Sequence, residues 1–155
     1  MGDRLAHLQG AVDRLAGRGV RVVAGSSVYR TAPVGGPEQD DFLNAVVIVE
    51  STLTPHELLA ACMDIEAQHD RVREVRWGPR TLDVDLIDVG GCTLDDDELT
   101  LPHPRAHERA FVCIPWLEID PGAVLSGRAV STLEWDSSEV RRCVDMQLVS
   151  PASEQ

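Results

Sequence analysis

Residues 42–69, FLNAVVIVESTLTPHELLAACMDIEAQH, contain a strand signal followed directly by a helix signal. Residues 42–50 are mostly apolar, which is typical of a strand in the interior of a sheet. Thr54 and Glu57 frame a capping box with Pro55 at the first helical position, so a helix is expected to begin there. One side of this helix then carries Leu58, Leu59, Cys62, Ile65, Glu66 and His69.

The flanking segments extend this unit in both directions. Before it, residues 2–17 show apolar residues at helical spacing, and residues 20–30 are β-branched and alternating, as in a strand. After it, residues 82–89 predict a third strand that ends in a glycine turn at 90–91 and a hairpin. A short helix is expected over residues 111–118, and the signal weakens beyond it. The order is helix, strand, strand, helix, strand.

One more strand in front would complete a β-α-β-β-α-β unit. The predicted fold class is therefore α+β, a ferredoxin-like antiparallel sheet with helices on one face, whose first strand is missing from the sequence. That strand would lie between residues 42–50 and 82–89, so its loss leaves backbone groups unpaired. We expect Met1 to be an internal methionine taken for the start, and the 155-residue form to fold poorly. Residues 1–150 would form one N-terminally truncated domain, with 151–155 as a disordered tail.

The composition is that of a soluble globular protein of one domain, with 155 residues, 43% apolar and 26% charged. A net charge of −12 disfavours partners that need a basic surface, such as nucleic acid or anionic lipid. All 14 basic residues are Arg, so any cation in a site must be a guanidinium. No apolar run is long enough to span a membrane, and no leader is visible. The four cysteines form no C-x-x-C pair, which favours reduced thiols and a cytoplasmic location.

Two long loops are expected, at residues 31–41 and 70–81, and the second is rich in arginine. It holds Arg71, Arg73, Arg76 and Arg80. So much local positive charge on an acidic chain indicates a polyanion site. The alternative is that these arginines pair with acids elsewhere in the fold.

Asp83 and Asp85 follow this loop directly and are two residues apart, so on a strand they share a face. Paired carboxylates suit Mg²⁺, which takes few protein ligands and keeps water and phosphate oxygens. The alternative is a solvated acidic face. Beside the arginine loop, the pair favours phosphoryl or pyrophosphoryl transfer.

Other nucleotide and metal motifs are excluded or weak. The chain has no G-x-x-x-x-G-K-[ST], no G-x-G-x-x-G and no Lys, which excludes a Walker or kinase-type cradle. His103 and His107 lack the further ligands of a zinc site, so a nucleotide contact or a surface role is favoured. Trp77, beside Gly78 and Pro79, is placed to stack as a lid over an aromatic ligand.

Three stretches carry a resemblance to a known family. They are RVREVRWGPRTLDVDLI at 71–87, SSVYRTAPVGGPEQDDFLNAVV at 26–47 and LTLPHPRAHERAFVCIPWLEI at 99–119. Over residues 2–124 the chain resembles the 6-hydroxymethyl-7,8-dihydropterin pyrophosphokinases of folate synthesis, and the W-G-P-R-T-L-D-[LV]-D block is highly specific. In that family ATP donates its β,γ-pyrophosphoryl group to the pterin hydroxymethyl and releases AMP.

The resemblance implies a role for each matching residue. Two Mg²⁺ ions would be held by Asp83 and Asp85. The phosphate charge during transfer would be neutralised by Arg71 and Arg80. The ATP side would comprise Glu66, Arg73, Arg76, His103 and Arg109. The pterin side would comprise Asn44 at the ring edge, Thr31 and Val34 through their main chains, and Phe42, Trp77 and Phe111 around the ring. The implied partners are small molecules, and the expected state is a monomer.

A second class of function stays open at this point. A ferredoxin-like paralogue that only binds ligand, or one that has degenerated, would share the fold without the chemistry. Such a protein would not need two carboxylates beside four arginines. Release of AMP from ATP would separate the two readings.

Overall fold

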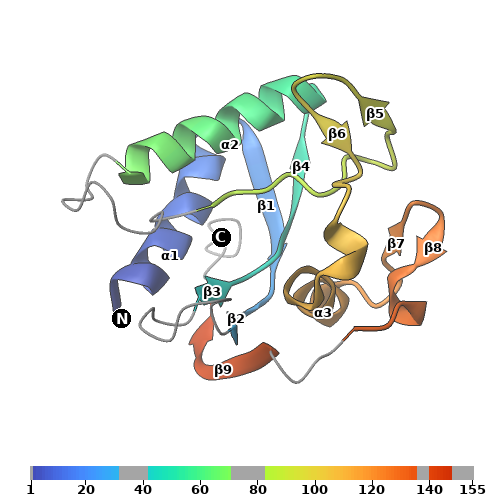
Figure 1. Ribbon diagram of the computed structural model, residues 1–155. Helices are drawn as coiled ribbons and strands as arrows, with labels where there is room; N and C mark the ends of the chain where they lie inside the picture. The colour runs from blue at the N-terminus through green and yellow to red at the C-terminus, as the bar shows by residue number, and fades with distance from the viewer. Residues whose placement is uncertain (1, 32–41, 71–82, 136–139, 148–155) are drawn as a thin grey trace.

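The computed structural model describes residues 2–31, 42–70, 83–135 and 140–147 (Figure 1). In those ranges it combines three α-helices with short antiparallel sheets, which confirms the α+β class. None of the helices within these ranges has the length and apolar character needed to cross a membrane.

Two helices lie side by side over the first sheet (Figure 1). They are α1, Gly2–Ala16, and α2, Pro55–Asp70, both close to their predicted bounds. The capping box of α2 forms as predicted: the Thr54 N–H donates to Glu57 Oε1 at 2.8 Å, and the Glu57 N–H donates to Thr54 Oγ1 at 3.2 Å. Below them a core of fully buried side chains includes Val20, Val22, Val28 and Ile65.

Each of the first two predicted strands is present but interrupted. Residues 20–30 form β1, Val20–Gly25, and β2, Ser27–Thr31, while residues 42–50 form β3, Phe42–Asn44, and β4, Val47–Ser51. Strand β1 pairs with β4, and β2 pairs with β3, both antiparallel.

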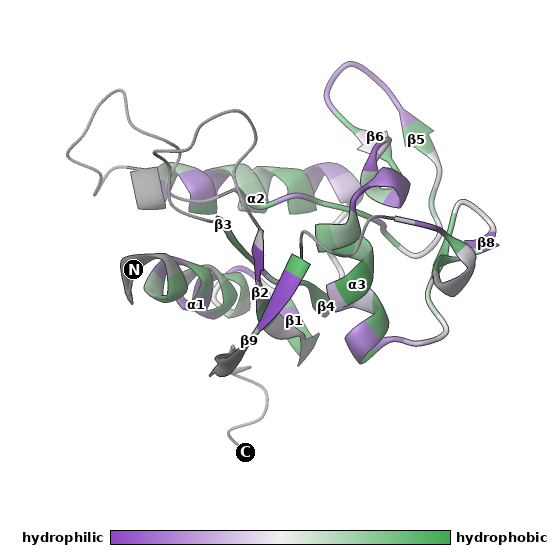
Figure 2. Cartoon of the chain, turned by 60° about the horizontal axis from the view of Figure 1, so that its bottom comes forward, coloured by the Kyte–Doolittle hydropathy of each residue, from purple (hydrophilic) through white to green (hydrophobic). Residues whose placement is uncertain are grey.

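A further strand, β9, Val140–Gln147, pairs antiparallel with the other edge of β2. Its beginning is mainly hydrophilic in Figure 2, because Arg141 and Arg142 follow directly after Val140. This strand has little of the apolar alternation that marks a half-buried strand.

The prediction of a strand over residues 82–89 is wrong for its described part. Residues 83–88 have no strand assignment, and none of the described strands pairs with them. Val84, Leu86 and Val89 nevertheless pack against the core beneath α1 and α2. The glycine turn is confirmed, because Gly90 and Gly91 have φ of 56° and 75°. The hairpin that follows is β5, Leu94–Asp95, paired with β6, Thr100–Leu101.

The remaining elements build a second hydrophobic cluster. Helix α3, Ala110–Ile119, agrees with the predicted helix within a residue at each end. Around it lie two short 3₁₀ helices, Ala106–Glu108 and Val130–Thr132, and a hairpin of β7, Val124–Leu125, with β8, Arg128–Ala129. Cys113 and Val130 are fully buried in this cluster.

Candidate functional site

The structure describes about half of the predicted site. It contains the side chains of Thr31, Asn44, Glu66, Asp83, Asp85, His103, Arg109 and Phe111 and the strand position of Phe42. The other predicted residues lie outside the described ranges: Val34, Arg71, Arg73, Arg76, Trp77 and Arg80. The described part of the site therefore consists of residues 83–88, called the acidic segment, and of the side chains around them.

The acidic segment is attached to helix α2 through its backbone. The side chains of Asp83 and Asp85 are exposed, while Val84 between them is half-buried. The Val84 N–H donates to Glu66 Oε2 at 2.6 Å. A carboxylate acceptor makes a strong, short hydrogen bond to a backbone N–H. Glu66 thus supplies an acceptor to a segment that has no strand partner in the described chain.

A cation lies beside the second carboxylate. Arg109, the residue before α3, places Nη1 3.9 Å from Asp85 Oδ2. The same guanidinium lies 5.5 Å from the centre of the Phe111 ring, within the range of a cation–π contact. The structure therefore brings Asp85, Arg109 and Phe111 together, residues that the resemblance assigned to the metal, the ATP and the pterin side.

His103 joins the acidic segment from the other side. Its N–H donates to the Ile87 carbonyl at 2.7 Å. Burial lowers the pKa of His103, and the charges of Arg109 and Arg105 lower it further, while Asp85 acts in the opposite direction. The Arg105 N–H donates to His103 Nδ1 at 3.2 Å, which leaves the imidazole proton on Nε2. A neutral imidazole with a single donor at Nε2 suits a hydrogen bond to a nucleotide.

A second group of predicted residues lies on the strands β2 and β3. Asn44 Nδ2 donates to Thr31 Oγ1 at 3.0 Å, across paired strands. This bond fixes the orientation of an amide that carries both a donor and an acceptor. Such a group can make paired hydrogen bonds to the edge of a heterocycle.

The donor set fits magnesium better than zinc. Within the described ranges no group of three or more His, Cys, Asp or Glu side chains could enclose a metal ion. Two exposed carboxylates on one segment, Asp83 and Asp85, match an ion that completes its shell with water and phosphate.

The cysteines take no part in this chemistry. All four are free thiols, as predicted, although Cys92 is exposed. Burial, together with the nearby charges of Glu66 and Asp85, raises the pKa of Cys62 to about 11. Cys62 is therefore a neutral filler beneath the acidic segment.

Sequence reasoning missed one polar residue that links two elements. Glu118, in the last turn of α3, accepts hydrogen bonds from the start of β2. A single acid near the end of an apolar helix gives no pattern by which it could be found.

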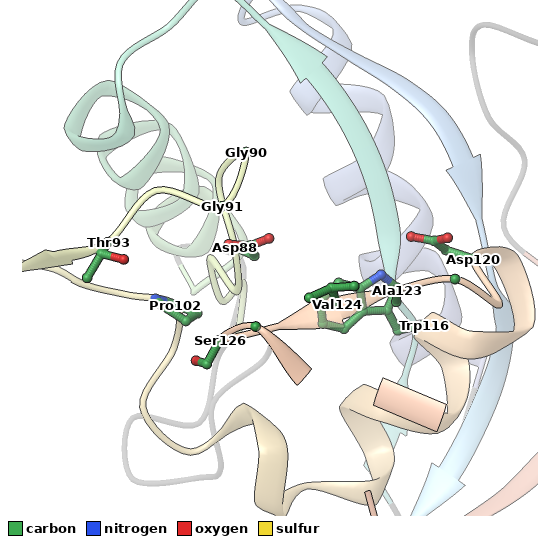
Figure 3. Close-up of a pocket in the computed structure, with 12 residues that line it drawn as sticks. Asp88, Gly90, Gly91, Thr93, Pro102, Trp116, Asp120, Ala123, Val124 and Ser126 are labelled. Atoms are coloured by element: carbon green, nitrogen blue, oxygen red, sulfur yellow. The ribbon is translucent and has the colours of Figure 1, made fainter. Parts of the chain in front are cut away.

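A separate cavity of about 710 Å³ lies between the turn at residues 90–91, the end of α3 and the β7–β8 hairpin (Figure 3). None of the predicted site residues lines it. Its charged lining groups are the carboxylates Asp88 and Asp120, which would repel phosphate. We therefore place the candidate site at the acidic segment.

Comparisons with known proteins point to one group of enzymes. Residues 1–121 match the sequence family described as 7,8-dihydro-6-hydroxymethylpterin-pyrophosphokinase. A 2-amino-4-hydroxy-6-hydroxymethyldihydropteridine pyrophosphokinase of Methylorubrum extorquens is 50% identical over 131 residues, which cover 84% of this chain and 83% of that protein. Proteins of the same name from Mycobacterium tuberculosis and Bacillus subtilis are 46% and 43% identical. They match 81% and 77% of this chain, and 71% and 72% of their own lengths.

Proposed function

The chain belongs to the 7,8-dihydro-6-hydroxymethylpterin-pyrophosphokinase family, and we propose that it transfers pyrophosphate from ATP to 6-hydroxymethyl-7,8-dihydropterin in folate biosynthesis. The hydroxymethyl oxygen attacks the β-phosphorus of ATP, and the bond from that phosphorus to the α–β bridging oxygen breaks. AMP leaves with the bridging oxygen, and the hydroxyl proton is lost to solvent. The observation that carries this proposal is the assembly of Asp85 with Arg109 and His103 beside Asp83.

Asp83 and Asp85 would hold Mg²⁺, and we propose two ions. When bound, the ions supply positive charge that offsets the negative charge of the ATP phosphates. The exposed carboxylates support this assignment, because a magnesium ion on phosphate needs open coordination positions. Glu66 would act from behind, since its bond to the Val84 N–H fixes the backbone between the two aspartates.

The ATP side would be formed by guanidinium and imidazole groups. Arg109, which lies 3.9 Å from Asp85, and His103, whose pKa is lowered by burial, would contact the nucleotide. Arg71 and Arg80 would stabilise charge that develops on the transferred group, and Arg73 and Arg76 would assist from the same loop. Planar guanidinium groups bind phosphate oxygens in pairs, which suits a chain whose only strong bases are arginines.

The pterin side would be formed by β2, β3 and the start of α3. The Asn44 amide, held by Thr31, would hydrogen-bond the edge of the ring, with main-chain contacts from Thr31 and Val34. Phe111 would lie against one face of the ring, with Phe42 and Trp77 completing the enclosure. Offset stacking of flat rings is worth about 0.5–1.5 kcal/mol beyond the burial of area.

The charge of the chain supports the remaining assignments. A net charge of −12 favours small-molecule substrates over nucleic acid as partners. We propose a cytoplasmic monomer, consistent with free thiols at all four cysteines.

The test is formation of AMP from ATP, Mg²⁺ and the hydroxymethyl pterin. Asp83→Asn and Asp85→Asn should each lower turnover by at least about a hundredfold, since metal-assisted charge stabilisation contributes several kcal/mol. Asp88→Asn is the matched control, because Asp88 belongs to the same segment but lines the separate cavity. The wild-type chain should form AMP, and Asp88→Asn should match it. A chain that binds pterin and ATP but forms no AMP would favour the binding module instead.

A further inference from the structure

The hairpin that carries the proposed pterin contacts is interrupted at Ser26. The Ser26 N–H donates to the Val46 carbonyl at 2.9 Å, as in an ordinary ladder. The Val46 N–H, however, donates to the Ser26 side chain Oγ, also at 2.9 Å. A hydroxyl thus replaces a main-chain acceptor at this point. Beyond it the ladder resumes as β2 and β3, with β9 on the other edge of β2, and one further contact reaches β2 from outside the sheet.

Glu118 supplies that contact from helix α3. Its two carboxylate oxygens each lie 3.1 Å from the Ser27 N–H, and Oε2 accepts from Ser27 Oγ at 2.8 Å. Oε1 accepts from the Tyr29 hydroxyl at 2.7 Å. All three donors belong to β2. Charge-assisted bonds of this kind are stronger and more directional than neutral ones.

Glu118 and Phe111 lie seven residues apart on α3, a rise of about 10 Å along the helix axis. On the strand side, Tyr29 is paired with Asn44, and Asn44 bonds Thr31. The same helix therefore carries Phe111, a proposed pterin contact, and Glu118, which binds the strand that carries Thr31.

We propose that Glu118 is a positioning residue that holds β2 on α3 and so sets where Asn44 and Thr31 lie relative to Phe111. This inference rests on the proposed function, which assigns Asn44 and Phe111 to the pterin ring. Its consequence is that Glu118 controls affinity for the pterin and leaves affinity for ATP unchanged.

The test compares Glu118→Gln with the wild type. Glutamine keeps the size of the side chain but turns an NH₂ group toward N–H and O–H donors. The Kd of the hydroxymethyl pterin, measured by its fluorescence with α,β-methylene-ATP bound, should rise at least about tenfold, the effect of losing one charge-assisted bond. The Kd of the ATP analogue should change less than about twofold. Tyr29→Phe, which removes one donor of three, should give a smaller rise in the same direction.

The control is Glu134→Gln, which neutralises an exposed carboxylate away from β2. Amide hydrogen exchange provides a readout that needs no ligand. It should quicken in β2 and β3 of Glu118→Gln and stay constant in β1 and β4. An unchanged pterin Kd in a folded variant, or equal changes for both ligands, would overturn the role of Glu118. A wild-type chain that binds pterin yet forms no AMP would overturn the proposed function and leave the Glu118 comparison intact.

Discussion

Among single residues, Glu66 shows best how the structure refines a sequence prediction. The resemblance assigns it to the ATP side, and the structure adds that its carboxylate accepts the Val84 N–H at 2.6 Å. The two roles differ in what they require of the side chain. Contact with a backbone N–H needs only an acceptor oxygen, while an electrostatic role needs the negative charge.

We predict that Glu66→Gln keeps most of the activity and that Glu66→Ala loses it. The amide oxygen of glutamine can still accept from Val84, but alanine leaves that N–H without this acceptor. The expected fall in kcat for Glu66→Ala is about tenfold, corresponding to one backbone bond lost. Steady-state AMP formation measures both variants. An equal loss in Glu66→Gln and Glu66→Ala would show that the charge, not the hydrogen bond, matters.

Tyr29 offers a direct view of the bond to Glu118. Burial, followed by the hydrogen bond and charge of Glu118, raises the pKa of Tyr29 to about 12, while Arg142 acts in the opposite direction. This phenol is the only tyrosine of the chain, so a titration of tyrosinate absorbance reports on it alone. Because the folded pKa lies above the ordinary value of 10.0, this stabilisation is complete below pH 10 and is lost as pH rises toward 12.

We predict an ionisation midpoint near pH 12 in the folded chain and a lower one in Glu118→Gln. Circular dichroism recorded at each pH serves as the control for alkaline unfolding. A midpoint near 10 while the chain is still folded would contradict the bond between Tyr29 and Glu118.

At the scale of elements, the acidic segment differs from the strands on which it packs. Residues 83–88 have no ladder partner in the described chain, whereas β1 and β4 pair with each other. We predict faster amide hydrogen exchange over 83–89 than over β1, because ladder bonds protect amides and side-chain packing alone does so less. The Val84 amide, bonded to Glu66, should be the slow exception. Uniformly slow exchange across 83–89 would indicate a strand pairing there.

Elements with local signals were predictable, and those that depend on distant partners were not. Helix α2 begins at its capping box because Thr54 and Glu57 satisfy each other's backbone N–H groups. A strand, in contrast, exists only where a second strand pairs with it. The alternation of apolar and polar residues in this segment puts Val84 and Leu86 against the hydrophobic core. It does not produce a strand, because no described strand pairs with residues 83–89. Strand β9, hydrophilic at its start, pairs with β2 without any such alternation.

The candidate site likewise contains residues that a local pattern reveals and residues that depend on distant contacts. Spacing predicted that Asp83 and Asp85 share a face, and both side chains are exposed. Arg109, which only the family resemblance assigned to the site, lies 3.9 Å from Asp85. The contact of Glu118 with β2 joins positions about ninety residues apart, as the separation of 91 between Glu118 and Ser27 shows. No local pattern encodes a contact of that range.

At the scale of the whole molecule, the described residues form two separate cores, one under α1 and α2 and one around α3. Ile65 is fully buried in the first, while Met63, on the same helix, is 58% exposed. We predict that Ile65→Ala lowers the free energy of unfolding by about 2–5 kcal/mol, through lost burial and a cavity. Met63→Ala is the matched control and should stay within about 0.5 kcal/mol of the wild type. Urea unfolding measures both, and equal effects would contradict the position of this core.

The central claim for the whole chain is that pyrophosphate, and not a single phosphate, moves from ATP to the pterin. The most direct measurement uses ATP labelled at its β-phosphorus, with Mg²⁺ and 6-hydroxymethyl-7,8-dihydropterin, and locates the label after turnover. We expect the label in the pterin product and an unlabelled AMP. Label that remains in the nucleotide product as ADP would contradict the claim.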